Sequence, residues 1–230
     1  GLSPERNVSL STGTMVTEAL RALGHRAGLI DLYFGLETGG ADEAFFDAPV
    51  SEAYKKISRE APDLDQVRRG RKGDSPSMFG PGVLELCRMA DMVFLALHGT
   101  CGEDGRVQAA FDLMGIPYTG AGYLGSAIAM DKDLTKRMVA DVVSTPGWKT
   151  VTYTAADIDR LVETARLPLV VKPVASGSSI GVSIAYTAEE LRRSLTEGLA
   201  LGGRTVLEEY IRGREIQVGI LEDKALPSIE

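Results

Sequence analysis

Residues 170–182 read Val-Val-Lys-Pro-Val-Ala-Ser-Gly-Ser-Ser-Ile-Gly-Val, an apolar run that carries Lys172 into a loop of small residues. The pattern predicts a strand over 169–173, then the loop, then a second strand over 181–186. Small residues let backbone amides approach a polyphosphate, hydroxyls add donors, and the lysine supplies a point charge. The stretch therefore predicts a phosphate-binding loop, and because no helix follows, it is not a Walker A loop. A flexible hairpin loop is the alternative.

A second polar group follows the strand predicted over 204–209. Residues 206–218 read Val-Leu-Glu-Glu-Tyr-Ile-Arg-Gly-Arg-Glu-Ile-Gln-Val and place Glu208 at the end of that strand. Glu215 is expected at the start of the next strand, with Gly213 in the turn between them. Carboxylates at strand ends can accept hydrogen bonds from an exocyclic amine or from ribose hydroxyls. Taken alone, a solvated turn is the commoner meaning of this pattern.

Helices alternate with apolar runs in the first half of the chain. The alternation predicts an open, mostly parallel α/β sheet with right-handed crossovers up to about residue 120. Ligands of such sheets gather beyond the carboxyl ends of strands, where His98 lies. The expected helices are 8–23, 83–89 and 106–114, and the expected strands are 28–34 and 92–97.

Residues 37–82 have weak periodicity. A helix is expected near 52–57 and a mobile loop after it. The basic run Arg68-Arg-Gly-Arg-Lys72 is surrounded by glycine and proline with little apolar content. We therefore expect residues 60–80 to be poorly ordered.

The pattern changes after Asp131. Strands and helices no longer alternate strictly, which predicts a small α+β domain separate from the first. The expected helices are 134–142 and 188–199, and the expected strands are 148–153, 169–173, 181–186 and 204–209.

Composition excludes several classes of protein. The chain has 230 residues with 44% hydrophobic and 25% charged content, so a disordered chain is excluded. Its net charge of -7 comes with scattered basic residues, which argues against nucleic acid as a partner. No apolar stretch approaches the roughly 20 residues that span a bilayer, so no membrane insertion is expected. Two cysteines and no recognisable leader favour the cytoplasm.

Together these segments resemble the nucleotide-binding half of ATP-grasp enzymes, and further motifs resemble the D-alanine:D-alanine ligases of that superfamily. The motifs occur in the order of that family over nearly the whole chain. They are Ser3-Pro-Glu-Arg-Asn-Val-Ser-Leu10, Leu97-His-Gly99, Gly102-Glu-Asp-Gly105, Ile116-Pro-Tyr-Thr-Gly120, Met130-Asp-Lys132, Lys172-Pro173 and Gly177-Ser-Ser179. Both ends of the chain look cut against this pattern, so 1–120 would be an N-terminal α/β substrate domain, 121–207 the central ATP-grasp subdomain and 208–230 the beginning of a C-terminal one.

The resemblance implies an ATP-dependent carboxylate-amine ligase of peptidoglycan precursor synthesis. ATP would phosphorylate the carboxylate of one D-alanine, and the amine of a second would attack the acyl phosphate to give the dipeptide, ADP and phosphate. A cytoplasmic homodimer is also implied. The alternatives are a D-alanine:D-lactate or D-alanine:D-serine ligase, another ATP-grasp ligase, and a non-catalytic nucleotide-binding module.

The resemblance also assigns residues to the nucleotide. Phosphates would meet Lys132 and Lys172 beside the loop, and adenine and ribose would meet carboxylates and backbone further along. The residues expected to bind ATP are Lys132, Lys172, Ser178, Ser179, Glu208, Tyr210 and Glu215. The Mg²⁺ ligands of the family belong to a later segment, so no metal ligand is assigned in this chain, and we expect the chain alone to turn over poorly.

The catalytic residues implied by the resemblance are Glu5, His98 and Ser178. Glu5 would bind the ammonium of the first D-alanine, and His98 would lie near its carboxylate. Ser178 would join Glu5 in a hydrogen-bonded network. The alternatives are that Glu5 is a helix N-terminal acid favoured by the macrodipole and that His98 is a satisfied histidine at a strand end.

One motif points to a different cofactor and is set aside. Gly120-Ala-Gly-Tyr-Leu-Gly125 fits the dinucleotide-binding pattern G-x-G-x-x-G. The preceding residues 116–119 make a poor buried strand, and no acidic residue follows at the required distance of about 20 residues. A nicotinamide dehydrogenase is therefore the weaker interpretation.

Overall fold

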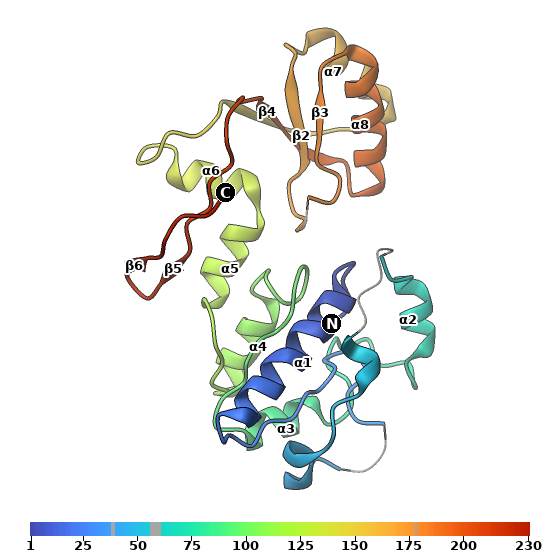
Figure 1. Cartoon of the computed structure of the whole chain (residues 1–230). Coiled ribbons are helices and arrows are strands. Elements are labelled where there is room, and N and C mark those ends of the chain that lie inside the picture. Colours follow the sequence, from blue (N-terminus) through green and yellow to red (C-terminus); the bar gives the residue numbers. More distant parts are fainter. Residues whose placement is uncertain (38–39, 56–60, 178) are drawn as a thin grey trace. The chain divides into compact units, whose positions relative to one another are not determined.

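The chain divides into two compact units, each with its own hydrophobic core (Figure 1). The computed structural model describes residues 1–37, 40–55, 61–177 and 179–230. Unit 1 comprises residues 1–139 and 174–180, and unit 2 comprises residues 140–173 and 181–230. Both units mix helices or helical turns with extended segments, and the chain is of the α/β class.

Unit 1 is built mainly from helices. The helices predicted over 83–89 and 106–114 are confirmed to the residue, and those predicted over 8–23 and 134–142 are confirmed with shifted ends. Helix α5 was not predicted; it begins after Gly122, inside the glycine motif that was set aside. The α-helices are α1 (Arg6–Ala22), α2 (Leu64–Gly70), α3 (Val83–Met89), α4 (Arg106–Met114), α5 (Tyr123–Met130) and α6 (Lys132–Val139).

Helix α1 buries a small, polar face. Met15 on its apolar side is 58% exposed, whereas Thr14 and Thr17 are buried. Both threonine hydroxyls donate to backbone oxygens one turn earlier, so their burial leaves no donor unpaired. A Cβ on Gly13 would lie 2.6 Å from Leu29 Cδ1. The helix therefore packs by close approach of small residues rather than by an apolar stripe.

The strands predicted over 28–34 and 92–97 were wrong for the described part of the chain. A single parallel bridge joins Val93 to Tyr118 there, and the backbone N–H of Thr119 donates to Val93 O at 3.0 Å. An apolar run indicates burial, but a strand also requires a neighbour paired in register. The runs do supply the core around α3 and α4, whose buried members are Leu32, Val83, Cys87, Val107, Phe111 and Ile116.

A helix lies in the segment that the sequence predicts to be poorly ordered. The carboxylate of Asp63 caps α2 by accepting from the backbone N–H groups of Asp65 and Gln66 at 2.9 and 3.0 Å. After the helix, the Arg71 guanidinium donates to Phe79 O at 2.9 Å. The prediction for 60–80 was therefore wrong over α2, because an N-cap and ordinary helix formers outweigh the glycine and proline around them.

Two short 3₁₀ helices precede α2. They are η1 (Glu43–Asp47) and η2 (Glu52–Lys55). The helix predicted near 52–57 is thus a single 3₁₀ turn, and residues 56–60 lie outside the described residues.

Unit 2 contains a four-stranded antiparallel sheet in the order β1-β4-β2-β3. The strands are β1 (Trp148–Thr152), β2 (Leu169–Pro173), β3 (Ser183–Ala185) and β4 (Arg204–Glu209). All four predicted strands are confirmed, with β2 and β4 correct to the residue. Strand β4 lies between β1 and β2, and four of its six residues are buried, as a strand inside a sheet requires.

Helices α7 (Ile158–Thr164) and α8 (Ala188–Ala200) accompany the sheet, and η3 (Ala155–Asp157) precedes α7. Helix α8 packs on β2, β3, β4 and α7. It begins with a capping box in which Glu190 N donates to Thr187 Oγ1 and Thr187 N donates to the Glu190 carboxylate. Leu191 and Leu195 from α8 are fully buried against Val171 of β2 and Leu207 of β4.

The last twenty residues are exposed. They contain a hairpin of β5 (Ile220–Leu221) and β6 (Lys224–Ala225), closed by a turn in which Glu222 has a φ of 57°. The strand predicted to start at Glu215 was wrong, because 215 lies in irregular chain and pairing begins only with the bridge from Gln217 to Ile229.

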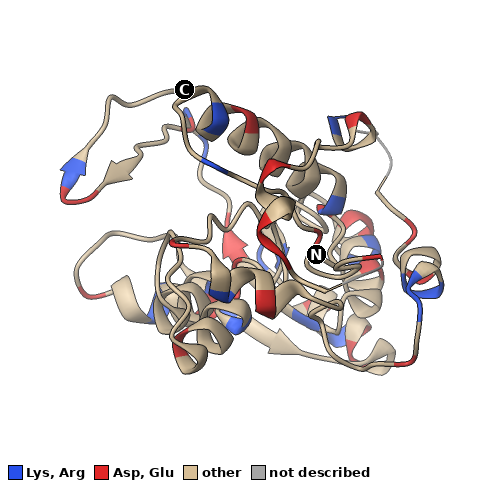
Figure 2. Cartoon of the chain, turned by 90° about the horizontal axis from the view of Figure 1, so that it is seen from below, with Lys and Arg blue, Asp and Glu red and all other residues tan. Residues whose placement is uncertain are grey.

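Charges of both signs are interspersed along the ribbon (Figure 2). No described helix is both long enough and apolar enough to cross a membrane.

Candidate functional site

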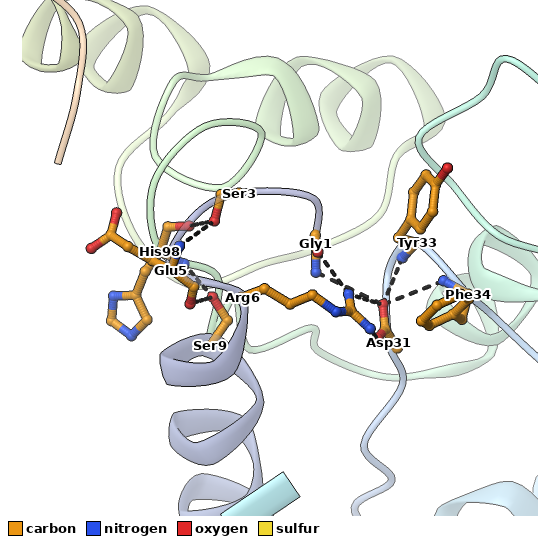
Figure 3. Close-up of polar contacts among 9 residues, drawn as sticks. All are labelled: Gly1, Ser3, Glu5, Arg6, Ser9, Asp31, Tyr33, Phe34 and His98. Atoms are coloured by element: carbon orange, nitrogen blue, oxygen red, sulfur yellow. Dashed lines mark hydrogen bonds and ion pairs between the residues drawn. The ribbon is translucent and has the colours of Figure 1, made fainter. Parts of the chain in front are cut away.

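Glu5 lies at the N-cap position of α1 in unit 1. Its side chain makes no capping hydrogen bond to the first turn of the helix, so it does not act as an N-cap in the usual way. Figure 3 shows Glu5 and Arg6 leaving the start of α1 in opposite directions, Glu5 on the side of His98 and Arg6 toward Asp31. The Glu5 carboxylate is therefore placed for contacts outside its own helix.

His98 is held by three residues of the α1 segment. Its backbone N–H donates to Ser9 Oγ at 2.9 Å, and its carbonyl oxygen accepts from Ser3 Oγ at 2.8 Å (Figure 3). Its ring nitrogen Nε2 lies 3.0 Å from Thr12 Oγ1. Ser9 Oγ donates in turn to Glu5 O at 3.1 Å. Glu5 and His98 are thus linked through the α1 segment, and their shared role in one site stays a prediction.

The loop after His98 is fixed by its own acidic residues. Glu103 Oε2 accepts from Gly99 N at 2.6 Å, and Asp104 Oδ2 accepts from Cys101 N at 3.0 Å. A cavity of about 450 Å³ lies beside this loop, and Thr12, His98 and Glu103 are part of its lining. The histidine ring is therefore both anchored and reachable.

A buried ion pair supports the start of α1. Arg6 donates to both carboxylate oxygens of Asp31, and its guanidinium carbon lies 4.8 Å from the centre of the Phe34 ring. Asp31 also accepts from Tyr33 N at 2.9 Å (Figure 3). Burial alone would raise the pKa of Asp31, but the hydrogen bonds and charge of Arg6 outweigh it, so this pKa lies below its ordinary value.

The small-residue loop, residues 174–180, belongs to unit 1 and is bound to the start of α6. Lys132 donates through its backbone N–H to Val174 O at 3.0 Å and through Nζ to Ser176 O at 2.7 Å. A Cβ on Gly177 would lie 2.7 Å from Glu5 Oε2. Glu5, Lys132 and the loop therefore meet within one unit.

Of the two neighbouring serines of the loop, the structure describes only Ser179. Ser179 is exposed, with a φ of 57° in the left-handed region. Ser178 lies outside the described residues, so the predicted network between Ser178 and Glu5 stays a prediction.

In unit 2, Lys172 and Glu208 form an ion pair across β2 and β4. Lys172 Nζ lies 2.8 Å from Glu208 Oε1, and the two side chains are 27% and 9% exposed. Glu208 is opposite Val170 in the antiparallel ladder, so Lys172 is its diagonal neighbour. The predicted neighbours of the nucleotide thus share one face of the sheet, with the ammonium still reachable.

Tyr210 follows β4, and Glu215 lies further along the exposed chain. The rings of Tyr210 and Tyr186 meet edge to face with centres 5.7 Å apart. A hydrogen bond with Tyr210 raises the pKa of the Tyr186 hydroxyl. Glu215 is exposed.

Several residues of this site were not found from the sequence. Ser3, Ser9 and Thr12 hold His98 but stand more than eighty residues before it, and no local pattern links them. Asp31 did carry a signal, since it is a charge inside the apolar run 28–34. A buried charge requires a partner, and Arg6 is that partner.

Within the part of the chain that the structure describes, the acidic, cysteine and histidine side chains do not gather into a metal site. Among residues 1–37, 40–55, 61–177 and 179–230, no three of them are placed to hold one ion.

Comparisons with known proteins cover both units. Residues 1–121 match the family model described as D-ala D-ala ligase N-terminus, and residues 140–230 match the one described as D-ala D-ala ligase C-terminus. The D-alanine–D-alanine ligase of Lacticaseibacillus casei is 38% identical over the whole chain, and that of Pediococcus pentosaceus is 40% identical. The chain spans 64% of the length of the first relative and 66% of the second.

Solved structures give the same resemblance. The D-alanine–D-alanine ligase from Bacillus anthracis matches with a TM-score of 0.56 and 38% identity, over 64% of this chain and 48% of that one. The structure of that ligase complexed with ATP matches with a TM-score of 0.54 and 36% identity, over 64% and 49%. The VanG D-Ala:D-Ser ligase from Enterococcus faecalis matches with a TM-score of 0.51 and 34% identity, over 56% and 38%.

Proposed function

The chain belongs to the D-alanine–D-alanine ligase family, and from this premise we propose that it acts in ATP-dependent joining of two D-alanines to D-alanyl-D-alanine. A phosphoryl group passes from ATP to a carboxylate oxygen of the first D-alanine, which gives an acyl phosphate and ADP. The amine of the second D-alanine then attacks the carbonyl carbon, and phosphate leaves. The dipeptide serves peptidoglycan precursor synthesis in the cytoplasm.

The contact between Glu5 and the loop 174–180 carries the proposal. A carboxylate suits the ammonium of an amino acid. Lys132, which is hydrogen-bonded to the same loop, suits the phosphoryl group that the carboxylate of that amino acid receives. Ser178 and Ser179 would add donors to the phosphates. An amino-acid site and a phosphate site within one unit favour a ligase over a module that only binds nucleotide.

Lys172, Glu208, Tyr210 and Glu215 are proposed to hold the nucleotide. Lys172 is 27% exposed and can reach a phosphate, while Glu208 accepts hydrogen bonds and suits the exocyclic amine of adenine. Glu208, the backbone at Tyr210 and Glu215 would serve the adenine and ribose. The pair fits ATP because it presents a donor and an acceptor side by side, and the similar Bacillus anthracis ligase complexed with ATP supports this assignment.

Mg²⁺ is proposed as the ion that accompanies ATP. The described residues do not fit a magnesium site, since no three suitable side chains come together among them. We therefore assign no ligand and no catalytic step to the ion. We also propose the homodimer and the domains 1–120, 121–207 and 208–230 that the family resemblance implies.

The test is an assay of ADP release by the product of the complete gene, with D-alanine, D-serine and D-lactate offered as second substrates beside D-alanine. The proposal predicts ADP release that depends on D-alanine, with D-alanyl-D-alanine as the main product. Preference for D-serine or D-lactate would contradict D-alanine as the second substrate. ATP binding without turnover would contradict the ligase activity and favour a module that only binds nucleotide.

A further inference from the structure

Two glycines from distant parts of the chain flank the Glu5 carboxylate. A Cβ built on Gly99 would lie 2.7 Å from Glu5 Oε2. One built on Gly177 would lie 2.7 Å from the same oxygen and 3.6 Å from Oε1. Both distances to Oε2 are shorter than real Cβ contacts, so the carboxylate occupies a slot that exists only because neither residue has a side chain.

The two glycines are required for different reasons. Gly99 has a φ of +74°, so its backbone conformation alone favours glycine. Gly177 is not among the positive-φ residues, and its backbone would accept an ordinary L-residue. The three atoms nearest to its hypothetical Cβ all belong to Glu5. Only the Glu5 carboxyl group therefore excludes a side chain at position 177.

The loop around Gly177 is anchored by its own hydrogen bonds. Lys132 binds the carbonyl oxygens of Val174 and Ser176, and Ile180 N donates to Gly177 O at 3.1 Å. Ser176 Oγ donates to Ile180 O at 3.2 Å. The Glu5 carboxylate is the far end of a long side chain, which shifts at a lower cost than the backbone of the loop. A methyl group at 177 would thus push the carboxylate aside rather than open the loop, and the fold would lose little.

We propose that Gly177 is a positioning residue for Glu5. Because Gly177 has no side chain, the Glu5 carboxylate can occupy the position in which it binds the ammonium of the first amino acid. The proposal rests on the proposed substrate role of Glu5. The loop that approaches the phosphates would in this way also fix the group that holds the amino acid. A misplacement of about 1 Å can cost on the order of 100-fold in rate, and a shift of several tenths of an ångström is needed here.

The test is Gly177→Ala in the product of the complete gene, measured by steady-state kinetics in both substrates. The expected result is a rise of roughly 10-fold in KM for the first D-alanine, a KM for ATP within about twofold of wild type, and an unchanged melting temperature. The matched control is Gly40→Ala, because a Cβ there meets nothing within 4 Å and Gly40 is not part of the lining of the cavity beside His98. A rise in KM for ATP alone would overturn the proposal, since it would make Gly177 a phosphate-loop residue only.

Shortening the carboxylate side chain gives an independent arm. Glu5→Asp withdraws the carboxylate by one methylene and frees the space that a methyl group at position 177 needs. The double variant Glu5→Asp/Gly177→Ala should therefore bind D-alanine no worse than Glu5→Asp alone. Additive losses would contradict a shared slot.

Failure of this proposal can be told from failure of the proposed function. If Glu5→Asp changes D-alanine kinetics and Gly177→Ala does not, Glu5 keeps its role and the positioning proposal falls. If neither variant alters D-alanine kinetics, Glu5 does not bind the substrate. Both the proposed role of Glu5 and the positioning role of Gly177 are then contradicted.

Discussion

Unit 1 and unit 2 hold their candidate site residues by different means. In unit 1, Glu5 and His98 are set by hydrogen bonds from serine and threonine side chains of the α1 segment. In unit 2, Lys172 and Glu208 are set by the register of β2 against β4 and by their own ion pair. A cluster of separate hydrogen bonds can be loosened one contact at a time, whereas a strand-borne pair changes only when one of its members changes.

The difference extends to what lies underneath. The unit 1 cluster stands on the buried pair Arg6–Asp31, whose loss would disturb the start of α1 as a whole. The unit 2 pair lies on a sheet that has a hydrophobic core beside it, in which Leu191 of α8 and Val206 of β4 are fully buried. We therefore expect substitutions beneath the site to matter most in unit 1.

The largest expected effect is the loss of stability from Asp31→Asn. Removing one partner of a buried ion pair leaves the other charge uncompensated and costs about 3 to 5 kcal/mol. The matched control is Asp47→Asn, which breaks the exposed pair with Arg26 and should cost under about 1 kcal/mol. Urea unfolding of the protein would measure both, and equal midpoints for the two variants would show that Arg6–Asp31 does not support the fold.

The same pair gives a pH dependence with a definite sign. The pKa of Asp31 is lowered on folding, so its stabilisation is fully present above the unfolded value of about 3.9 and is lost as pH falls through the lower folded value. The difference in unfolding free energy between wild type and Asp31→Asn should therefore shrink in acid. A constant difference down to about pH 2 would contradict this account of the pair.

The next effect concerns Lys172 and Glu208. Lys172→Met removes the charge that we propose binds a phosphate, and it takes the ion pair from a buried carboxylate. We therefore expect ATP affinity to fall at least about 10-fold and stability to fall as well. Adding Glu208→Gln should restore stability but not ATP affinity. Trp148, the only tryptophan, is opposite Glu208 in the ladder and can report binding by fluorescence.

The control for this pair is Lys149→Met, which removes an exposed lysine from the neighbouring strand β1. It should change neither ATP affinity nor stability. If Lys149→Met and Lys172→Met weaken ATP equally, general positive charge on the sheet accounts for binding and the specific pair does not.

A smaller effect is expected from Thr12→Val, which keeps the shape of the side chain but removes the hydroxyl 3.0 Å from His98 Nε2. One hydrogen bond is worth about 1 kcal/mol, or roughly fivefold in KM for D-alanine. Thr12→Ser keeps the hydroxyl and should behave as wild type. Nitrogen NMR of the imidazole would follow its tautomer, and an unaltered spectrum and KM in Thr12→Val would remove Thr12 from the site.

The smallest expected effect is local to α2. Asp63→Ala removes the cap of a seven-residue helix far in sequence from the site residues, at a cost of about 1 kcal/mol. Amide exchange of residues 64–70 should accelerate while D-alanine and ATP kinetics stay unchanged. Exchange equally fast in the wild type would favour the loop that the composition predicts.

The sequence predicts unit 2 better than unit 1 for a physical reason. Each strand of unit 2's four-stranded sheet has its hydrogen-bonding partners in the same sheet, so a β-type run and an actual ladder coincide. In unit 1 the runs 28–34 and 92–97 are apolar but join only one bridge among the described residues. Burial is a property of the run itself, whereas pairing depends on a second segment.

The same distinction between local and long-range partners decides which residues of the candidate site could be predicted from the sequence. Lys172 and Glu208 could be predicted because each stands near the end of a strand that its own neighbours define. Thr12 and Ser3 could not, because their bonds to His98 span 86 and 95 residues and depend on how α1 packs. Polar residues on a helix face ordinarily indicate a solvated surface, and here that face is buried.

The most direct measurement of the central claim is the steady-state kinetics of Glu5→Gln in the complete enzyme. Glutamine keeps the size and most hydrogen bonding of Glu5 and removes its charge. A charge-assisted contact is worth about 1.5 to 3 kcal/mol, so KM for the first D-alanine should rise on the order of 10- to 150-fold while KM for ATP barely changes. The control is Glu18→Gln, which changes an exposed residue of the same helix and should leave the KM for D-alanine and the KM for ATP unchanged. Normal D-alanine dependence with a lowered melting temperature would show that Glu5 serves only the helix, and would contradict the account.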